Sequence, residues 1–359
     1  MRKILKKEDV KASLAGEKNL DRVPCCYTMW YIPWVFKPMA MMKTMLSRFK
    51  YPDDIATCGW HDLRWYFFAM DERYGSHLRC EISGVMEGGA PTVKRKYRKE
   101  GLGMDGHVLL EDMTKVDEVI AKMPDPKKAT LLFHMPSKRY KVAWLFSVFF
   151  ENHWTIRGME NTLMDFYLYP DEVKRLYRAM CDYHKGIIKR CKEELHADAV
   201  FFGDDMGTQN GPFFSPEIFR EFFFPLWKEM IDYAHSLGLQ VWLHSCGDVT
   251  LFIPMLIEAG LDILHPIQKY AMDQEKVFEE YHDKIGFFYG FDVQQVIPFG
   301  TADEVEAECK RTMDLFSQAK GRLVYTAGNA FAGDCKPECF DRLMKVSHTY
   351  NPYKNRKNK

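Results

Sequence analysis

The chain has 359 residues, 47% hydrophobic and 28% charged, a composition that can bury a large core and keep a charged surface. Fifty acidic residues balance fifty basic ones, which excludes the one-signed field that gathers nucleic acid or an anionic membrane. The ten cysteines lack the regular spacing of a disulfide framework and no export signal is visible, so we expect reduced thiols in a cytoplasmic protein.

The first half of the sequence is irregular. "MRKILKKEDVKASL" has the polar spacing of an amphipathic helix, and "RVPCCYTMWY" has the pattern of an opening strand. "EGGAPTVKRKYRKEGLG" resembles a hairpin framed by glycines. "VAWLFSVFF", from Val142 to Phe150, is too short to cross a bilayer and predicts a buried strand with the turn that follows. We therefore expect helical and hairpin additions ahead of a more regular region.

The second half alternates strand and helix patterns. "DAVFFGDD" precedes a helix with Ser215 as N-cap, Pro216 at its first position and a stop at Gly238. Another helix begins after Thr301, with Glu304 three residues later as in a capping box. Further strands are predicted in "LQVWLHSCG", "LDILHPIQ", "IGFFYGFDVQQ" and "RLVYTAGNA".

Consecutive strand–helix units require parallel strands joined by helical crossovers, and continuous apolar strands suit a sheet that is covered on both faces. The sequence therefore predicts the α/β class and a (β/α)8 TIM barrel. No linker, low-complexity tract or repeat marks a boundary, so we expect a single domain over residues 1–359.

Polar side chains recur just beyond the apolar runs, where the active sites of such barrels collect. Asp204 and Asp205 end one predicted strand, and Glu151 and His153 follow another. Two adjacent carboxylates need a partner if they are buried, although helix capping is an alternative explanation. The other residues at strand ends are His244, Cys246, His265, Gln268, Asp292, Gln294 and Asn329.

The His-x-Cys pair supplies two ligands of the kinds that zinc prefers, and a catalytic zinc uses three protein ligands. Because residues two apart at a strand end point the same way, His244 and Cys246 can converge on one ion. Cys335 is the best thiol for the third position. Alternatives for that position are Asp205, Asp334, Glu151 and Asn329. The pair also has a structural alternative, a hydrogen-bonded core histidine beside an inert cysteine.

With these motifs in place, the sequence resembles the uroporphyrinogen decarboxylase-like superfamily, including its cobalamin-dependent methyltransferases. The resemblance rests on "FFGDDMGTQNGPFFSPEIFREFFFPLWKEMIDYAH", "VWLHSCGDV", "LDILHPIQ", "GFDVQQVIPFGTADEVEAEC" and "KPECF". It covers Asp198 to Cys339, with weaker support from "ENHWTIRGMENTLMDFYLYPDEV". The methyltransferase branch implies a zinc site of His-x-Cys and a distant Cys. The third family position falls near Asn329, and Cys335 follows it six residues later.

The resemblance implies methyl transfer to or from a corrinoid carried by a separate protein. We prefer a small O-methyl donor, an aryl methyl ether, because "MWYIPWVFKPMAMMKTM" is rich in aromatic rings and methionines and lacks the fixed cations that a polyanionic tetrapyrrole needs. Asp205 is the first candidate for proton handling, followed by Glu151, with Asp204 beside them. The predicted substrate-binding residues are Tyr27, Trp30, Trp34, His153, Trp154, Gln209, His265, Gln268, Asp292 and Asn329.

The sequence leaves two other functions open. One is a decarboxylase-type lyase, and the other is a catalytically silent barrel that binds a small molecule or serves as a subunit of a complex. The oligomeric state is also open, a homodimer being one option.

Overall fold

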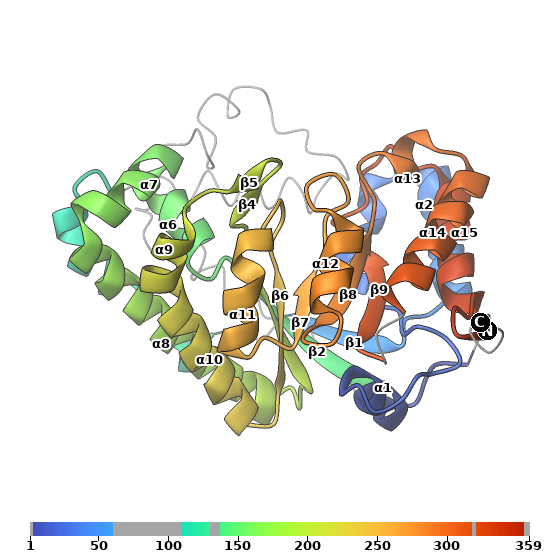
Figure 1. Ribbon diagram of the computed structural model, residues 1–359, viewed down its shortest axis with the longest axis horizontal. Coiled ribbons are helices and arrows are strands. Elements are labelled where there is room, and N and C mark those ends of the chain that lie inside the picture. The colour runs from blue at the N-terminus through green and yellow to red at the C-terminus, as the bar shows by residue number, and fades with distance from the viewer. Residues whose placement is uncertain (1–2, 60–109, 130–136, 318–320, 355–359) are drawn as a thin grey trace. The chain divides into compact units, whose positions relative to one another are not determined.

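The computed structural model describes residues 3–59, 110–129, 137–317 and 321–354 of the chain (Figure 1). The chain divides into two compact units. The first unit consists of Met1–Thr57, Pro136–Val142 and Asp262–Lys359, and the second of Cys58–Met135 and Ala143–Leu261. The hairpin predicted in "EGGAPTVKRKYRKEGLG" lies outside the described residues.

The second unit is built around two parallel strands, β3 (Ala199–Gly203) and β6 (Gln240–His244). Their register pairs Gly203 with His244, so the two strands end side by side. Parallel strands joined by a helical crossover are the unit that the sequence predicts. The connection contains β4 (Gly207–Thr208), β5 (Gly211–Pro212), α9 (Pro216–Ile218), the π-helical turn η6 (Phe219–Phe223) and α10 (Phe224–Ser236).

The helix boundaries predicted in this connection are confirmed. The Ser215 side chain accepts a hydrogen bond from the backbone N–H of Ile218 at 3.4 Å, and Pro216 occupies the first helical position. Past the end of α10, Gly238 has a φ of +69°, a conformation that glycine adopts without strain.

Long helices cover these strands. The helix α8 (Pro170–Glu193) lies beside α10 (Figure 1), and its buried residues recur at three- and four-residue spacing along one continuous face. Outside the β3–β6 connection, the described residues of the second unit form the helices and helical turns η4 (Met113–Lys115), α5 (Val116–Ile120), η5 (Pro126–Lys128), α6 (Phe150–Arg157), α7 (Met159–Leu168), α8, η7 (Thr250–Phe252) and α11 (Ile253–Ala259).

The first unit repeats the same plan with the parallel strands β7 (Ile263–His265), β8 (Gly286–Phe291) and β9 (Leu323–Ala327). Thr301 and Glu304 form the predicted capping box at the start of α14. The helices that follow these strands are α12 (Gln274–Tyr281), α13 (Val296–Phe299), α14 (Ala302–Phe316) and α15 (Pro337–Thr349).

The predicted opening strand is wrong for most of its length. Cys25 makes a single parallel bridge with Tyr325, and the chain then turns. The carboxylate of Asp53 accepts the backbone N–H groups of Tyr27 and Thr28 at 3.0 and 2.9 Å, which bends the segment into a 3-10 turn. The described elements before residue 60 are α1 (Lys7–Leu14), η1 (Thr28–Trp30), η2 (Pro33–Val35), α2 (Pro38–Lys50) and β1 (Ile55–Gly59), and the strand β2 (Tyr140–Phe146) comes later in the chain.

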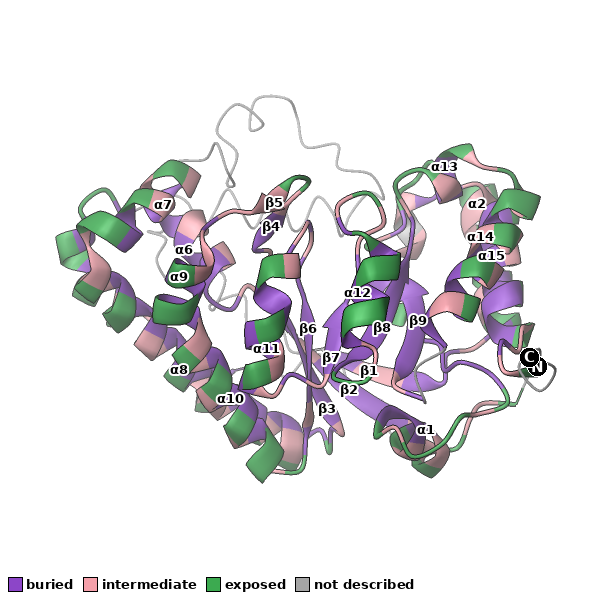
Figure 2. Ribbon diagram, viewed as in Figure 1, coloured by how far each residue is buried: buried purple, intermediate pink, exposed green. Residues whose placement is uncertain are grey.

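The strands of the parallel sheet are mostly buried, whereas the helices have both buried and exposed residues (Figure 2). Every residue of β3, β8 and β9 is buried, as expected for parallel strands whose two faces are both covered. Within the described residues, none of the helices has the length and apolar character needed to span a membrane.

Candidate metal centre

The metal candidates predicted in "HSC" lie where β6 ends. His244 is the last residue of the strand and is only 5% exposed, while Cys246 is half-buried in the loop that follows. The Sγ atom of Cys246 lies 3.4 Å from Nε2 of His244. The two side chains therefore converge, as their spacing predicts.

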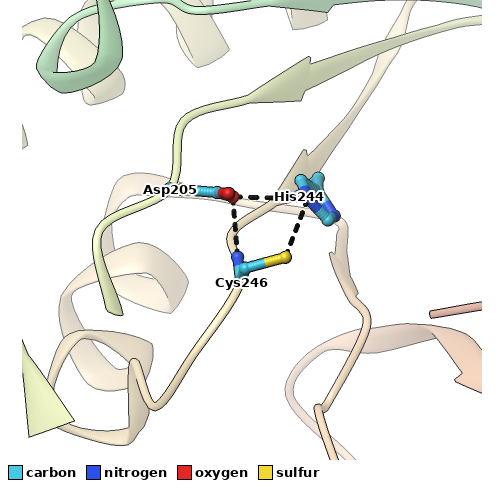
Figure 3. A group of neighbouring side chains, drawn as sticks. All are labelled: Asp205, His244 and Cys246. Atoms are coloured by element: carbon cyan, nitrogen blue, oxygen red, sulfur yellow. Dashed lines mark hydrogen bonds and ion pairs between the residues drawn. The ribbon is translucent and has the colours of Figure 1, made fainter. Parts of the chain in front are cut away.

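Asp205 joins this pair from the neighbouring strand. Because Gly203 is in register with His244, the residues after β3 lie beside the residues after β6. The Oδ1 atom of Asp205 lies 3.3 Å from Nε2 of His244 and accepts the backbone N–H of Cys246 at 2.8 Å (Figure 3). The ligand atoms of the three residues all lie within 4.8 Å of one another.

The geometry of this cluster fits a shared cation better than a nucleophile triad. In a triad the histidine uses one ring nitrogen for the nucleophile and the other for the carboxylate. Here Cys246 and Asp205 both approach the same nitrogen, Nε2 of His244. Zinc bonds of about 2.0 to 2.3 Å at tetrahedral angles place ligand atoms about 3.3 to 3.6 Å apart. The separations of 3.4 and 3.3 Å from Nε2 match that spacing.

The charged forms of His244 and Asp205 stabilise each other. Burial opposes a charge on His244, but Cys246 and Asp205 outweigh it and raise the pKa of the imidazole to about 10. Burial likewise opposes the charge on Asp205, and the His244 imidazole together with the Cys246 N–H holds the pKa of the carboxyl below its usual range. A positive charge at this point is therefore stabilised by the residues around it.

Asp204 has a different environment from its neighbour. Its carboxylate is fully buried and accepts the backbone N–H groups of Phe149, Phe150 and Glu151 at 3.2, 3.1 and 2.9 Å. Burial raises the pKa of Asp204 to about 7, although these three hydrogen bonds favour the charged form. The contacts correspond to the helix-capping alternative, because Asp204 satisfies the first N–H groups of α6.

Glu151 lies in the first turn of α6, held there by Asp204. Its side chain is half-buried and interacts electrostatically with Asp205, Asp204 and His244. Burial, followed by the charges of Asp205 and Asp204, raises the pKa of Glu151 well above its usual range. A carboxyl group in this setting holds its proton more tightly than a solvent-exposed glutamic acid does, which suits a role as a general acid.

Cys335, the thiol preferred from sequence for the third ligand position, belongs to the first unit. It is buried, and its Sγ lies 3.8 Å from the carbonyl oxygen of Lys336. Burial raises the pKa of this thiol, which disfavours the thiolate that zinc requires. Its role as ligand stays a prediction, as do those of Asp334 and Asn329. Among the described residues, Asp205 completes the compact set.

His153 is held in a buried network in the second unit. Its Nδ1 lies 3.1 Å from the hydroxyl of Tyr177, and its Nε2 lies 3.1 Å from Oδ2 of Asp165. Arg157 donates from Nε and Nη2 to the same carboxylate at 2.7 and 2.8 Å. Both ring nitrogens of His153 thus bind protein groups, which favours a structural role, and its substrate contact stays a prediction.

Three predicted substrate-binding residues lie in the core of the first unit. The His265 ring stacks on Trp30, with centroids 5.0 Å apart, and its Nε2 lies 3.1 Å from the carbonyl oxygen of Ala327. Tyr27 is fully buried beside Phe331. These contacts describe core packing, and contact of these residues with substrate stays a prediction.

Asp292 caps the helical turn after β8. Its carboxylate accepts the backbone N–H groups of Gln294, Gln295 and Val296 at 2.8, 3.2 and 3.0 Å. Gln268 donates from Nε2 to Oε1 of Gln294 at 3.3 Å. These bonds hold together the segments that follow β7 and β8. Substrate binding by Asp292 and Gln268 stays a prediction.

Three of the four remaining predicted substrate-binding residues are exposed or half-buried. Asn329 is exposed after β9, Gln209 is exposed between β4 and β5, and Trp154 is half-buried on α6. Trp34 lies in η2, and its side chain is outside the described part of the structure. Their contacts with substrate stay predictions.

The sequence model of the uroporphyrinogen decarboxylase (URO-D) family matches residues 150–350, more than half of the chain. The chain belongs to this family. The match includes β3, β6 and all three residues of the candidate metal centre. Membership in the URO-D family confirms the family predicted from the sequence motifs.

The solved structures show the fold of this URO-D family member. A methyltransferase from Methanosarcina mazei is similar over 96% of this chain and 98% of its own, with a TM-score of 0.60 and 14% identity. A B12-independent methionine synthase from Shewanella sp. W3-18-1 covers 58% of this chain and 62% of its own, with a TM-score of 0.40 and 13% identity. The likeness to the first confirms the predicted α/β, TIM-barrel-like fold. A search of curated proteins found no match.

Proposed function

We propose that this URO-D family member is a zinc-dependent methyltransferase that moves a methyl group between a small aryl methyl ether and the cobalt of a separate corrinoid protein. One observation carries the proposal: the ligand atoms of Asp205, His244 and Cys246 lie within 4.8 Å of one another. Three protein ligands leave the fourth position of a tetrahedral zinc for a reactant. In this proposal Asp205 replaces Cys335 as the third ligand.

Two further findings support methyl transfer. The fold is shared with a methyltransferase from Methanosarcina mazei along nearly the whole chain. The sequence also carries the His-x-Cys pair that the corrinoid-dependent branch of the superfamily uses for zinc. All nine cysteines in the described part of the chain are free thiols, which suits the reducing cytoplasm that we propose as its location.

We assign different chemical roles to the metal centre and to the residues around it. Zinc bound there would supply a Lewis acid that polarises the ether oxygen. Cleavage of the methyl–oxygen bond would leave its electron pair on oxygen, and the cobalt(I) of the partner's corrinoid would supply the pair for the new bond to the methyl group. Glu151, whose pKa is raised by burial and by the neighbouring carboxylates, would donate a proton to the departing oxygen. Asp204 fixes the start of α6 and so positions Glu151.

A second function, decarboxylation, is favoured by the family model alone. A tetrapyrrole with many carboxylates requires several fixed cations in its pocket. The aromatic early segment offers only Lys37 and Lys43 as charges, and both are exposed. A catalytically silent barrel is the third alternative. Zinc binding that depends on His244 and Cys246 separates the methyltransferase from both of these alternatives.

The test combines the protein with reduced corrinoid protein and a panel of methoxylated aromatic compounds. We expect the cobalt absorbance to report alkylation with the zinc-loaded protein, to stay constant after chelation, and to respond again when zinc is restored. Equal transfer before and after removal of zinc would contradict the metal assignment. Release of carbon dioxide from uroporphyrinogen, without any methyl transfer, would favour the lyase.

A further inference from the structure

The loops that carry the metal candidates touch through their backbones. A Cβ atom on Gly247 would lie 2.2 Å from the carbonyl carbon of Gly207, and a Cβ on Gly207 would lie 2.7 Å from the carbonyl oxygen of Cys246. Both distances are well inside van der Waals contact. Gly247 also has a φ of +79°, where other residues are strained. The loop after β3 and the loop after β6 therefore pack as closely as glycine allows.

Hydrogen bonds join the same two loops. The Oγ atom of Ser245 accepts the backbone N–H of Met206 at 2.8 Å, and both residues are fully buried. The backbone N–H of Asp248 donates to the carbonyl oxygen of Thr208 at 2.7 Å. A buried N–H without an acceptor is costly, so the Ser245 hydroxyl is an important part of this junction.

The position of Ser245 in the sequence gives this bond a role in the site. Ser245 lies between His244 and Cys246, and its side chain makes its bond with the other loop while its two neighbours turn to the cluster. Met206 directly follows Asp205. One hydrogen bond thus ties the segment that carries two metal candidates to the segment that carries the third.

We propose that Ser245 is a positioning residue that sets the separation between Asp205 and the His244–Cys246 pair, with the contact between Gly207 and Gly247 as the fixed spacer. This inference rests on the proposed zinc function. Loss of the Ser245 hydroxyl leaves the Met206 N–H unsatisfied and lets the Asp205 loop move relative to the other ligands. Partners that orient metal ligands typically contribute about 10- to 100-fold to metal affinity.

The first experiment measures zinc affinity by competition with a chromophoric chelator. We expect Ser245→Ala to weaken zinc binding by about 10-fold or more. Ser347→Ala is the matched control, because Ser347 is also a fully buried serine with a hydrogen-bonded hydroxyl, donating to the carbonyl oxygen of Met344, and lies in α15 of the first unit. The control should bind zinc as the wild type does.

The second experiment uses Gly207→Ala and cobalt(II) in place of zinc. The added methyl group pushes against the backbone of Cys246, so we expect altered ligand-field bands and a weaker thiolate charge-transfer band in protein whose circular dichroism is unchanged. A variant that merely loses stability would keep the wild-type cobalt spectrum while folded. If Ser245→Ala does not fold, Gly207→Ala still tests whether the junction positions the metal ligands.

The outcomes separate this inference from the proposed function. If the wild type binds zinc and both variants bind it equally well with unchanged cobalt spectra, the positioning role is refuted and the metal centre stands. If both variants lose the native circular dichroism, the junction supports the fold rather than the ligands, and the inference is again refuted. If the wild type binds no zinc, the proposed function and this inference are refuted together.

Discussion

Replacing Asp204 by Asn tests the division of roles between the two adjacent aspartates. In the structure, Oδ2 of Asp204 accepts the N–H groups of Phe149 and Phe150, and Oδ1 accepts the N–H of Glu151. Asparagine has one acceptor oxygen. In its better orientation it keeps two of these bonds and turns its NH₂ group toward the third N–H. At least one buried N–H group is then left without an acceptor.

An unsatisfied buried donor costs about 1 to 3 kcal/mol, so we expect Asp204→Asn to lower the free energy of unfolding by about that amount. Urea denaturation followed by circular dichroism measures the change. Asp232→Asn is the control, since Asp232 is an exposed partner of Lys228 and should change stability by less than about 0.5 kcal/mol. Zinc content should stay at the wild-type level in Asp204→Asn. A variant as stable as the control would refute the capping role.

Three further changes probe the remaining groups. Asp205→Asn keeps an oxygen for the Cys246 N–H but removes the ligand charge, so chelator competition should show zinc affinity reduced by about 10-fold or more; unchanged affinity would place the third ligand elsewhere. Glu151→Gln should reduce methyl transfer by about 100-fold or more at full zinc content, and an active variant would exclude it as the proton donor. Burial opposes the charge on Asp165, but hydrogen bonds from Arg157 and His153 outweigh it and lower its pKa. This carboxylate therefore stabilises the fold above its unfolded pKa of about 3.9, and the contribution is lost as the pH falls through the folded value. Asp165→Asn should flatten the acid-induced loss of stability below about pH 4, whereas wild-type acid sensitivity in that variant would contradict the assignment.

The fold of the second half could be predicted from sequence because local signals agree there. Ser215 caps a helix with its own side chain, and Thr301 with Glu304 forms a capping box. The segment "RVPCCYTMWY" has a strand-like pattern but forms a turn in the structure. The reason is a contact distant in sequence, the Asp53 carboxylate on the N–H groups of Tyr27 and Thr28, which periodicity cannot show.

The candidate site could be predicted in part. The spacing of His244 and Cys246 identified two convergent ligand atoms, since both lie at one strand end. The choice of a third partner depends on which strands are adjacent and in what register, and only the pairing of Gly203 with His244 places Asp205 there. The sequence did not identify Ser245, because its hydroxyl accepts a backbone N–H from another loop and residue type alone does not reveal such a bond. The one indication in the sequence was its position between two predicted metal ligands.

Metal analysis of protein purified without added zinc tests the central claim most directly. We predict about one zinc per chain in the wild type, in keeping with one set of three ligands. His244→Ala and Cys246→Ala should each lose the metal while retaining the native circular dichroism. A folded wild-type protein that contains no zinc and takes up none on titration would contradict the account.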